Sequence, residues 1–425
     1  AELLGLSGDV VASAITGGLS VEQARASFVA ELARTNQPLR RIEHGRSADD
    51  KFSAALLSTI EFRGGQIAQP AAEARDLVRQ DAVGLCALSL ERAGVQTSWM
   101  SREQIARAAL GQASGFEHGV PLMVGGGYNT TGTFPNLSLV AAHKALQKAF
   151  MEAETTYRLW ATRGDSLPDF RAKALVSLSE SGDLELQGEN QLPTEDQLSD
   201  AKEWLAIDKF ARAFSITWEM LLADDLGAIT RVPAQMGAAA DRTLNRLIYA
   251  VLTANPTMAD GYALFDATNH QGNLLTSGGA PSVTEIQRMR GAMKRMKGRN
   301  SRANLNIPLK FLLVPTTIEN EAEVAVGSTS STTDNKNEGV INPIKKFGIQ
   351  VVSDPNLDDV STTAYYGVAA GNAGDNIVYS FLQGQETPNF VTEYDAMRGV
   401  RKVMVQQSFG ASPAEYRTLV KNNGA

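Results

Sequence analysis

The chain has 425 residues, with 40 basic and 47 acidic side chains, four histidines and one cysteine, and its formal charge is −7. A negative balance removes any general attraction to nucleic acid or anionic membranes, and no apolar run approaches the ~20 residues that span a bilayer. The single cysteine, Cys86, excludes an intrachain disulfide framework and a thiolate zinc site within one chain. At about 100–200 residues per domain, the length predicts two to four structural regions.

The first third of the chain has the patterns of helices. A capping box at Ser20–Gln23 precedes an apolar stripe, an apolar pattern runs over 71–93, and a second capping box begins at Ser101. The glycine-rich stretch 111–133 has no such pattern. We therefore expect a helical N-terminal extension that ends in a linker.

An acidic hairpin is predicted in the main body. A helix is expected over 137–150 and a strand over 173–179. Residues 180–200 then carry seven acids and no lysine or arginine, and strand-compatible sequence resumes over 204–217. Arms of ~18 residues would reach up to ~60 Å. Such a hairpin buries little of itself, so we expect it to lie on another surface; a solvated acidic loop is the alternative.

The longest predicted helix covers 230–254. Pro233 fits its first turn, and an apolar stripe from Met236 to Val251 ends before Pro256. At 1.5 Å per residue this helix would be ~37 Å long. A long helix with a narrow apolar stripe suits the backbone of an elongated domain.

The remainder of the chain predicts mixed helices and strands. A capping box at Ser282 opens a helix to about Lys297, and residues 288–302 carry seven basic residues and no acid. That segment could bind phosphate, but a solvated or subunit-contacting face is favoured because no aromatic residues interleave the charges. Strands are expected at 310–314, 349–352, 364–369, 377–382 and 401–408, with a helix after Pro315. Connections of this kind predict an α+β fold.

Residues with catalytic potential are few. Gly125–Gly127 lacks the lysine of a phosphate loop, and His270 has no second histidine-rich segment to complete a metal site. Cys86 lies in an apolar segment, as buried structural cysteines do. The acids Asp224 and Asp225 precede a helix, whose dipole explains them. We predict no enzyme, no cofactor and no metal site, and a loop hydrogen-bonding role for His270.

Several segments carry a resemblance to a known family. They are Leu221–Ala240, Ala263–Leu274, Phe381–Gly384, Ser408–Ala411 and Tyr416–Ala425. In their order and spacing they resemble the major capsid proteins of tailed bacteriophages with the Hong Kong 97 fold. The likeness is greatest to the Mu-like subgroup, often encoded as a fusion with a prohead protease. It runs from about Phe134 to the C-terminus.

The resemblance implies an α+β Hong Kong 97-like capsid fold with a long spine helix, an extended β-hairpin loop, peripheral and axial domains, and a helical N-terminal extension. The implied division is 1–133 for the N-terminal extension and linker, 134–173 for the start of the peripheral domain, 174–214 for the extended loop, 215–256 for the peripheral domain with the spine helix, 257–385 for the axial domain, and 386–425 for the return to the peripheral domain.

The implied function is that of a non-enzymatic major head protein. Its copies would assemble as pentamers and hexamers into an icosahedral shell that encloses double-stranded DNA. Implied partners are the chain itself, the portal, scaffold or prohead protease during assembly, the packaged DNA without sequence specificity, and a decoration protein as a further candidate. The implied location is the virion, with assembly in the host cytoplasm and no membrane partner. The alternatives are an encapsulin-like compartment with a cargo enzyme, and an unrecognised hydrolase using Asp224, Asp225 or His270.

Two charged segments are candidate contacts between subunits. The acidic one holds Glu185, Glu189, Glu195 and Asp196, and the basic one holds Arg290, Lys294, Arg295, Lys297 and Arg299. Exposed ion pairs contribute only ~0–1 kcal/mol each, so apolar burial must supply most of the association energy.

A non-covalent shell is expected. Some members of the family cross-link subunits through a lysine of the extended loop, but residues 174–201 contain no lysine. Ala1 in place of methionine is consistent with maturation cleavage, and equally with trimming or a numbering choice.

Overall fold

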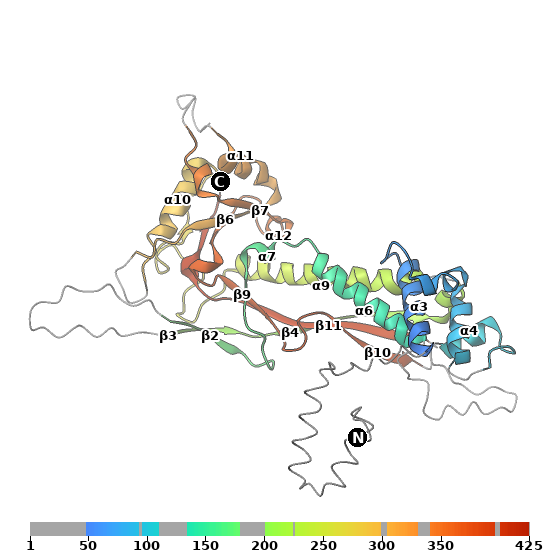
Figure 1. The fold of residues 1–425 in the computed structure, drawn as a ribbon. Helices are drawn as coiled ribbons and strands as arrows, with labels where there is room; N and C mark the ends of the chain where they lie inside the picture. Colours follow the sequence, from blue (N-terminus) through green and yellow to red (C-terminus); the bar gives the residue numbers. More distant parts are fainter. Residues whose placement is uncertain are drawn as a thin grey trace, which may run out of the picture. The chain divides into compact units, whose positions relative to one another are not determined.

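A computed structural model describes residues 48–92, 96–109, 134–178, 200–223, 226–298, 304–329, 341–395 and 400–424. The chain divides into two compact units, 1–55 and 56–425. The described part of the first unit, residues 48–55, belongs to helix α3 (Ala48–Arg63). The second unit holds the other described elements (Figure 1). The helix expected at Ser20 and the stretch 111–133 lie outside the described residues.

Two short helices of the second unit show how local capping decides where a helix begins. The continuous helix predicted over 71–93 is wrong: two 3₁₀ turns, η2 (Ala72–Ala74) and η3 (Leu77–Arg79), precede α4 (Ala82–Arg92). Gln80 is extended, and the Asp81 side chain accepts a hydrogen bond from the Gly84 main-chain nitrogen at 2.9 Å. Asp81 therefore caps a new helix.

The capping box predicted at Ser101 is confirmed. Helix α5 (Arg102–Ala109) follows it, and the Ser101 Oγ accepts from the Gln104 main-chain nitrogen at 3.3 Å. In return, the Gln104 side chain accepts from the Ser101 main-chain nitrogen at 2.8 Å. These two bonds satisfy donors that the first turn leaves free.

Two long helices pack closely on one another. Helix α6 (Phe134–Glu152) confirms the helix expected over 137–150, and α9 (Leu226–Ala254) confirms the one expected over 230–254. Because α9 begins earlier than predicted, Pro233 lies inside it rather than in its first turn. The helices approach so closely at Gly237 that a Cβ there would overlap the Leu146 carbonyl oxygen.

The first sheet has five strands and is built around β11 (Val400–Pro413), along which α9 lies (Figure 1). The order is β1 (Thr162–Arg163), β9 (Ile377–Phe381), β11 and β10 (Asn389–Asp395), with β4 (Asp208–Thr217) also paired to β11. The strand predicted over 401–408 is confirmed and is longer than expected. Strand β10 was not predicted.

The second sheet also has five strands. Their order is β5 (Leu274–Leu275), β12 (Leu419–Asn422), β8 (Tyr365–Ala369), β6 (Leu309–Val314) and β7 (Gln350–Ser353). Helices α10 (Val283–Lys294) and α11 (Glu319–Gly327) pack on it, and we call this sheet with its helices the second-sheet lobe. The shorter helices are α7 (Tyr157–Trp160), α8 (Trp218–Leu222), α12 (Pro355–Asp358), η4 (Thr316–Ile318), η5 (Ile344–Phe347), η6 (Gly371–Ala373) and η7 (Tyr416–Thr418).

Strand pairing crosses the domain boundaries implied by the resemblance. Strand β9, within the implied axial segment 257–385, pairs with β11 of the first sheet. Strand β12, within the implied return segment 386–425, pairs with β8 of the second sheet. The C-terminal segment therefore contributes a strand to each of the two sheets, β11 to the first and β12 to the second.

The predicted hairpin is present at its base. Strands β2 (Lys173–Leu178) and β3 (Asp200–Leu205) pair antiparallel, and the acidic tip over 179–199 lies outside the described residues. The strand expected over 204–217 is divided, because β3 ends at Leu205 and β4 pairs instead with β11. Leu205 and Ile207 are both buried, so the turn between β3 and β4 is held against the body of the protein.

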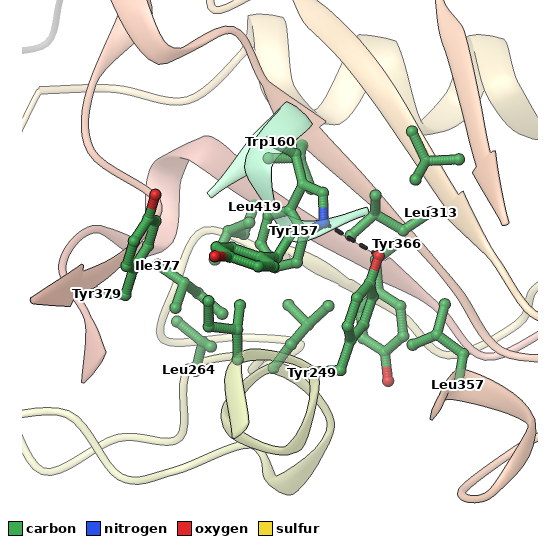
Figure 2. Packing of buried hydrophobic residues seen from close by; sticks show 14 of the residues in the cluster. Tyr157, Trp160, Tyr249, Leu264, Leu313, Leu357, Tyr366, Ile377, Tyr379 and Leu419 are labelled. Carbon is green, nitrogen blue, oxygen red and sulfur yellow. Dashed lines mark hydrogen bonds between the residues drawn. The ribbon is translucent and has the colours of Figure 1, made fainter. Parts of the chain in front are cut away.

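The main core lies where α9 meets the two sheets (Figure 2). Tyr157 and Trp160 of α7 pack there with Tyr249 of α9, and the Trp160 indole nitrogen donates to the Tyr249 hydroxyl at 3.1 Å. The rings of Tyr157 and Tyr379 meet edge to face, 5.2 Å apart. One core thus holds both sheets to the same helix.

Two helical glycines should respond in opposite directions to substitution by alanine, because only Gly237 lies where α6 and α9 approach closely. Gly237→Ala should lower the free energy of unfolding by about 1–2 kcal/mol, because the overlap with the Leu146 backbone outweighs the better helix propensity. Gly291→Ala in α10 should raise it by about 0.5–1 kcal/mol, because its Cβ would meet only the flexible end of Arg295. Urea unfolding of both variants measures this, and equal effects of the same sign would contradict the packing argument.

Candidate assembly surfaces

His270, one of the residues with catalytic potential, has a structural role. Its ring is buried and stacks on Tyr416, with centroids 4.0 Å apart. Nδ1 lies 3.1 Å from the Leu264 carbonyl oxygen, and Nε2 lies 2.8 Å from Asp260 Oδ2. Both partners are hydrogen-bond acceptors, so neither ring nitrogen is placed to bind a metal. The predicted hydrogen-bonding role of His270 is confirmed.

The described residues hold no group of three or more His, Cys, Asp or Glu side chains that could bind a metal ion. Asp224 and Asp225 lie outside these residues. Cys86 is buried as predicted, and burial together with Asp81 raises the pKa of its thiol. Within the same ranges, every helix is too short or too polar to cross a bilayer.

A cavity of about 440 Å³ lies between the hairpin base and η7. Apolar side chains such as Leu175 and Ile307 line it, together with the buried ion pair of Glu415 and Arg417, whose atoms are 2.9 Å apart. The described residues around it include no histidine, lysine or cysteine. The Thr418 hydroxyl, which also lines it, donates to the main-chain carbonyl oxygens of Asp375 and Glu415 at 3.3 and 3.0 Å, so the lining provides packing and charge neutralisation.

The predicted basic contact segment forms the exposed side of α10 and the turn after it. The other side of α10 is buried, with Met289 and Met293 in the lobe's core. Four of the predicted residues, Arg290, Lys294, Arg295 and Lys297, are exposed or half-exposed. The fifth, Arg299, lies outside the described residues.

Further basic side chains, which were not predicted as contacts from the sequence, lie around the ring of Phe347. The Arg290 guanidinium carbon lies 3.4 Å from the Phe347 ring centroid, and Lys346 Nζ lies 5.3 Å from it. Lys345 is exposed beside them on η5. Residues 341–350 contain two lysines and no acid, which is the signal that could have identified this part of the surface.

The acidic contact residues Glu185, Glu189, Glu195 and Asp196 lie outside the described residues. The hairpin base that would carry them is anchored by Glu203, which is buried and accepts hydrogen bonds from the Ala259 main-chain nitrogen at 3.1 and 3.2 Å. The opposite face of the base leaves Trp204 59% and Val176 55% exposed. An apolar face of this kind is suited to contact with another molecule.

A buried polar network holds the elements that carry these surfaces. Asp241 of α9 is fully buried, and it accepts hydrogen bonds from the Tyr157 hydroxyl at 2.9 Å and from Arg158 at 2.7 Å. Asn245, one turn later, donates to Asp354 at 2.9 Å. The sequence held a signal for this network, because Asp241 falls on the apolar stripe of α9, three residues before the buried Leu244.

Comparisons with known proteins matched this chain to a family model and to solved structures of low sequence identity. A family model described as "Phage capsid protein" matches residues 200–422, just over half of the chain. The capsid of Myoviridae phage XM1 is 12% identical, with a TM-score of 0.41 over 64% of this chain and 92% of that chain. A chain of Mycobacterium phage Patience is 11% identical (TM-score 0.44; 70% and 90%), and the virus-like particle from Pyrococcus furiosus is 8% identical (TM-score 0.38; 67% and 98%). No curated protein sequence matches the chain.

The buried network predicts a large effect for the loss of Asp241. Asp241→Ala should lower the free energy of unfolding by about 2 kcal/mol, because it leaves the buried Tyr157 hydroxyl without its acceptor, whereas Arg158 keeps the Phe150 and Met151 carbonyl oxygens. The control is Glu152→Ala, which breaks a surface pair with Lys148 at 4.0 Å and should cost less than about 0.5 kcal/mol. Urea unfolding compares the two variants. Equal losses would show that the network does not stabilise the body.

Proposed function

Because this chain belongs to the phage capsid protein family, we propose that it is the major head protein of a tailed bacteriophage, with pentamers and hexamers forming an icosahedral shell around double-stranded DNA. As a phage capsid protein it is a virion component that assembles with copies of itself into a shell. The match over 200–422 carries this conclusion, since it spans α9, the second-sheet lobe and almost all of the first sheet.

Exposed apolar side chains support association between copies. Ile341 is 79% exposed, Met151 63% and Trp204 59%. If a neighbouring subunit covered these side chains, their apolar surface would be removed from water, and association would be stabilised by about 25 cal/mol per Å² of that surface. Burial of such side chains is the main source of association energy that the proposal requires.

The proposal extends to the organisation and partners of the shell. The Mu-like subtype and the division into peripheral domain, extended loop and axial domain belong to it, with the boundary of the axial domain adjusted for the pairing of β9 and β12. So do the portal, scaffold or prohead protease as assembly partners, a decoration protein as a further candidate, the enclosed DNA, and assembly in the host cytoplasm.

The two charged segments are proposed as subunit contacts. The acidic residues Glu185, Glu189, Glu195 and Asp196 would meet a neighbouring copy at the hairpin, and the basic residues Arg290, Lys294, Arg295, Lys297 and Arg299 would do so at α10. Exposure of the described basic residues supports this assignment. An encapsulin-like compartment is not favoured, because the family that matches is one of phage capsid proteins.

Electron microscopy tests the shell directly. We expect negative-stain images of the purified chain at neutral pH to show rings of five and six subunits or closed particles of uniform diameter, with matching fast sedimentation. Because association of copies follows mass action, the fraction of protein in assembled particles should increase with protein concentration. A monodisperse monomer at every salt and protein concentration would contradict the proposal.

Denaturing gels test whether the shell is non-covalent. Because residues 174–201 contain no lysine, boiled particles should run as a single band at the 45.5 kDa of the chain. The control is the same sample treated with an amine-reactive cross-linker, which should give a ladder. A ladder of subunit multimers without the reagent would refute this prediction.

A further inference from the structure

The exposed side of α9 carries arginines and no acid. Among the residues of this helix whose side chains the structure describes, the exposed ones are Arg231, Gln235, Arg242, Arg246, Ala250 and Ala254. The acid of α9, Asp241, is buried and already pairs with Arg158 at 2.7 Å. Half of these exposed positions are therefore cationic, although the chain as a whole has a formal charge of −7.

The three arginines form a row along the helix. At about 100° per residue, Arg231, Arg242 and Arg246 fall within about 60° of the helix circumference. At 1.5 Å per residue, the distance from the first to the last is ~22 Å along the axis. We call these three residues the arginine row.

A fourth arginine lies on the same side of the first sheet. Phe210 of β4 stacks on Phe409, with ring centroids 4.3 Å apart, in the core that contains the buried residues of α9. Side chains two residues apart on a strand share a face. Arg212 therefore lies on the side of the sheet that α9 covers, and it is exposed. It adds to the positive charge on this side of the molecule.

These four arginines have no acidic partner in the described part of the chain. None of them forms an ion pair there. The lysines of the neighbouring helix α6 differ in this respect: Lys144 pairs with Glu61 at 2.8 Å, and Lys148 lies 4.0 Å from Glu152. The positive charge of the arginine row is thus available to a ligand.

Local helix effects oppose the arrangement of the arginine row. Arg242 and Arg246 are four residues apart, so they are neighbours on the helix surface and repel each other. None of the three arginines lies in the last turn of α9, where the helix dipole would stabilise a cation. A bound anion would relieve the repulsion.

We propose that the arginine row, together with Arg212, binds the phosphates of the enclosed duplex DNA without reading its sequence. This inference rests on the proposed function, which supplies the duplex. The guanidinium group presents a planar fork of donors that fits two phosphate oxygens at once. A duplex carries one negative charge per ~1.7 Å of its axis, so a row of this length can contact several phosphates.

DNA fits this surface better than a second copy of the chain does. Interfaces between proteins are centred on apolar and aromatic side chains, whereas protein–DNA interfaces are polar and strongly positive. Apart from the arginines, the exposed residues described on α9 are Gln235, Ala250 and Ala254, so this side lacks a large apolar anchor. Because the rest of the chain is acidic, we expect the binding to be weak and confined to this surface.

Fluorescence anisotropy of a short labelled duplex, with the full chain kept below its assembly concentration, provides the test. Arg231→Gln, Arg242→Gln and Arg246→Gln together should weaken binding at least about tenfold at ~0.1 M salt. They should also reduce the slope of log affinity against log salt by about 2 to 3, because three phosphate contacts are lost. Adding Arg212→Gln should reduce the slope by about one more. Duplexes of different sequence should behave alike.

A matched control removes the same charge elsewhere. Arg75→Gln, Arg79→Gln and Arg171→Gln are changes at exposed positions, and Arg171 already has Asp169 at 3.9 Å. This variant should bind the duplex as the unmodified chain does. Replacing the arginine row with three lysines keeps the charge and should retain most of the salt slope. All variants should melt at the temperature of the unmodified chain.

Several outcomes would overturn the inference. Unchanged affinity and slope after loss of the arginine row would do so, as would an equal loss in the matched control. If Lys345→Gln with Lys346→Gln abolished binding and the arginine-row variant did not, the DNA would be assigned to the second-sheet lobe. An arginine-row variant that bound DNA normally but failed to assemble would assign the row to a neighbouring copy.

Failure of the proposed function would look different. An unmodified chain that formed no particles, yet lost its DNA binding together with the arginine row, would overturn the shell and keep the row as a DNA-binding surface. Particles that form normally from the unmodified chain, with DNA binding that does not depend on the row, would keep the shell and overturn this inference.

Discussion

Two buried carboxylates, Asp241 and Asp354, fix the position of the long helix α9 relative to both sheets. Burying an ionised carboxylate costs several kcal/mol unless donors surround it. Asp241 has Arg158 and the Tyr157 hydroxyl as donors, and Asp354 has Asn245 together with Thr156. A shift of α9 by one turn would separate these carboxylates from their donors. The network therefore specifies one arrangement, whereas the apolar packing around it would tolerate several.

The surfaces proposed for assembly depend on this fixed arrangement. Glu203 and Leu205 secure the hairpin base to the body, and the buried side of α10 holds the basic residues of that helix on the second-sheet lobe. A contact between copies requires surfaces whose relative positions do not change, because ordering them during association costs free energy. The same residues that stabilise the single chain therefore prepare it for association.

Local signals in the sequence predicted most elements, and long-range pairing accounts for the rest. The capping boxes at Ser101 and Ser282 satisfy donors within one turn, so their helices begin where the sequence predicts. The break at Gln80 was missed because the apolar pattern continues through it. Strand β12 and the pairing of β4 with β11 depend on residues some 50 to 200 positions apart, for which periodicity carries no information. Lys345 and Lys346 became part of a surface only through the contact of Phe347 with Arg290.

Weak contacts between copies are suited to a closed shell. A pair of exposed charges contributes at most about 1 kcal/mol, so one wrongly oriented copy is lost easily. A correctly oriented copy makes several contacts with the same neighbour, and each contact after the first forms at a high effective concentration. The charges therefore select the orientation of each added subunit, and the buried apolar surface accumulates only after that orientation is correct. An interface as strong as the polar network around the buried Asp241 would remove this selection, because misplaced copies could not dissociate.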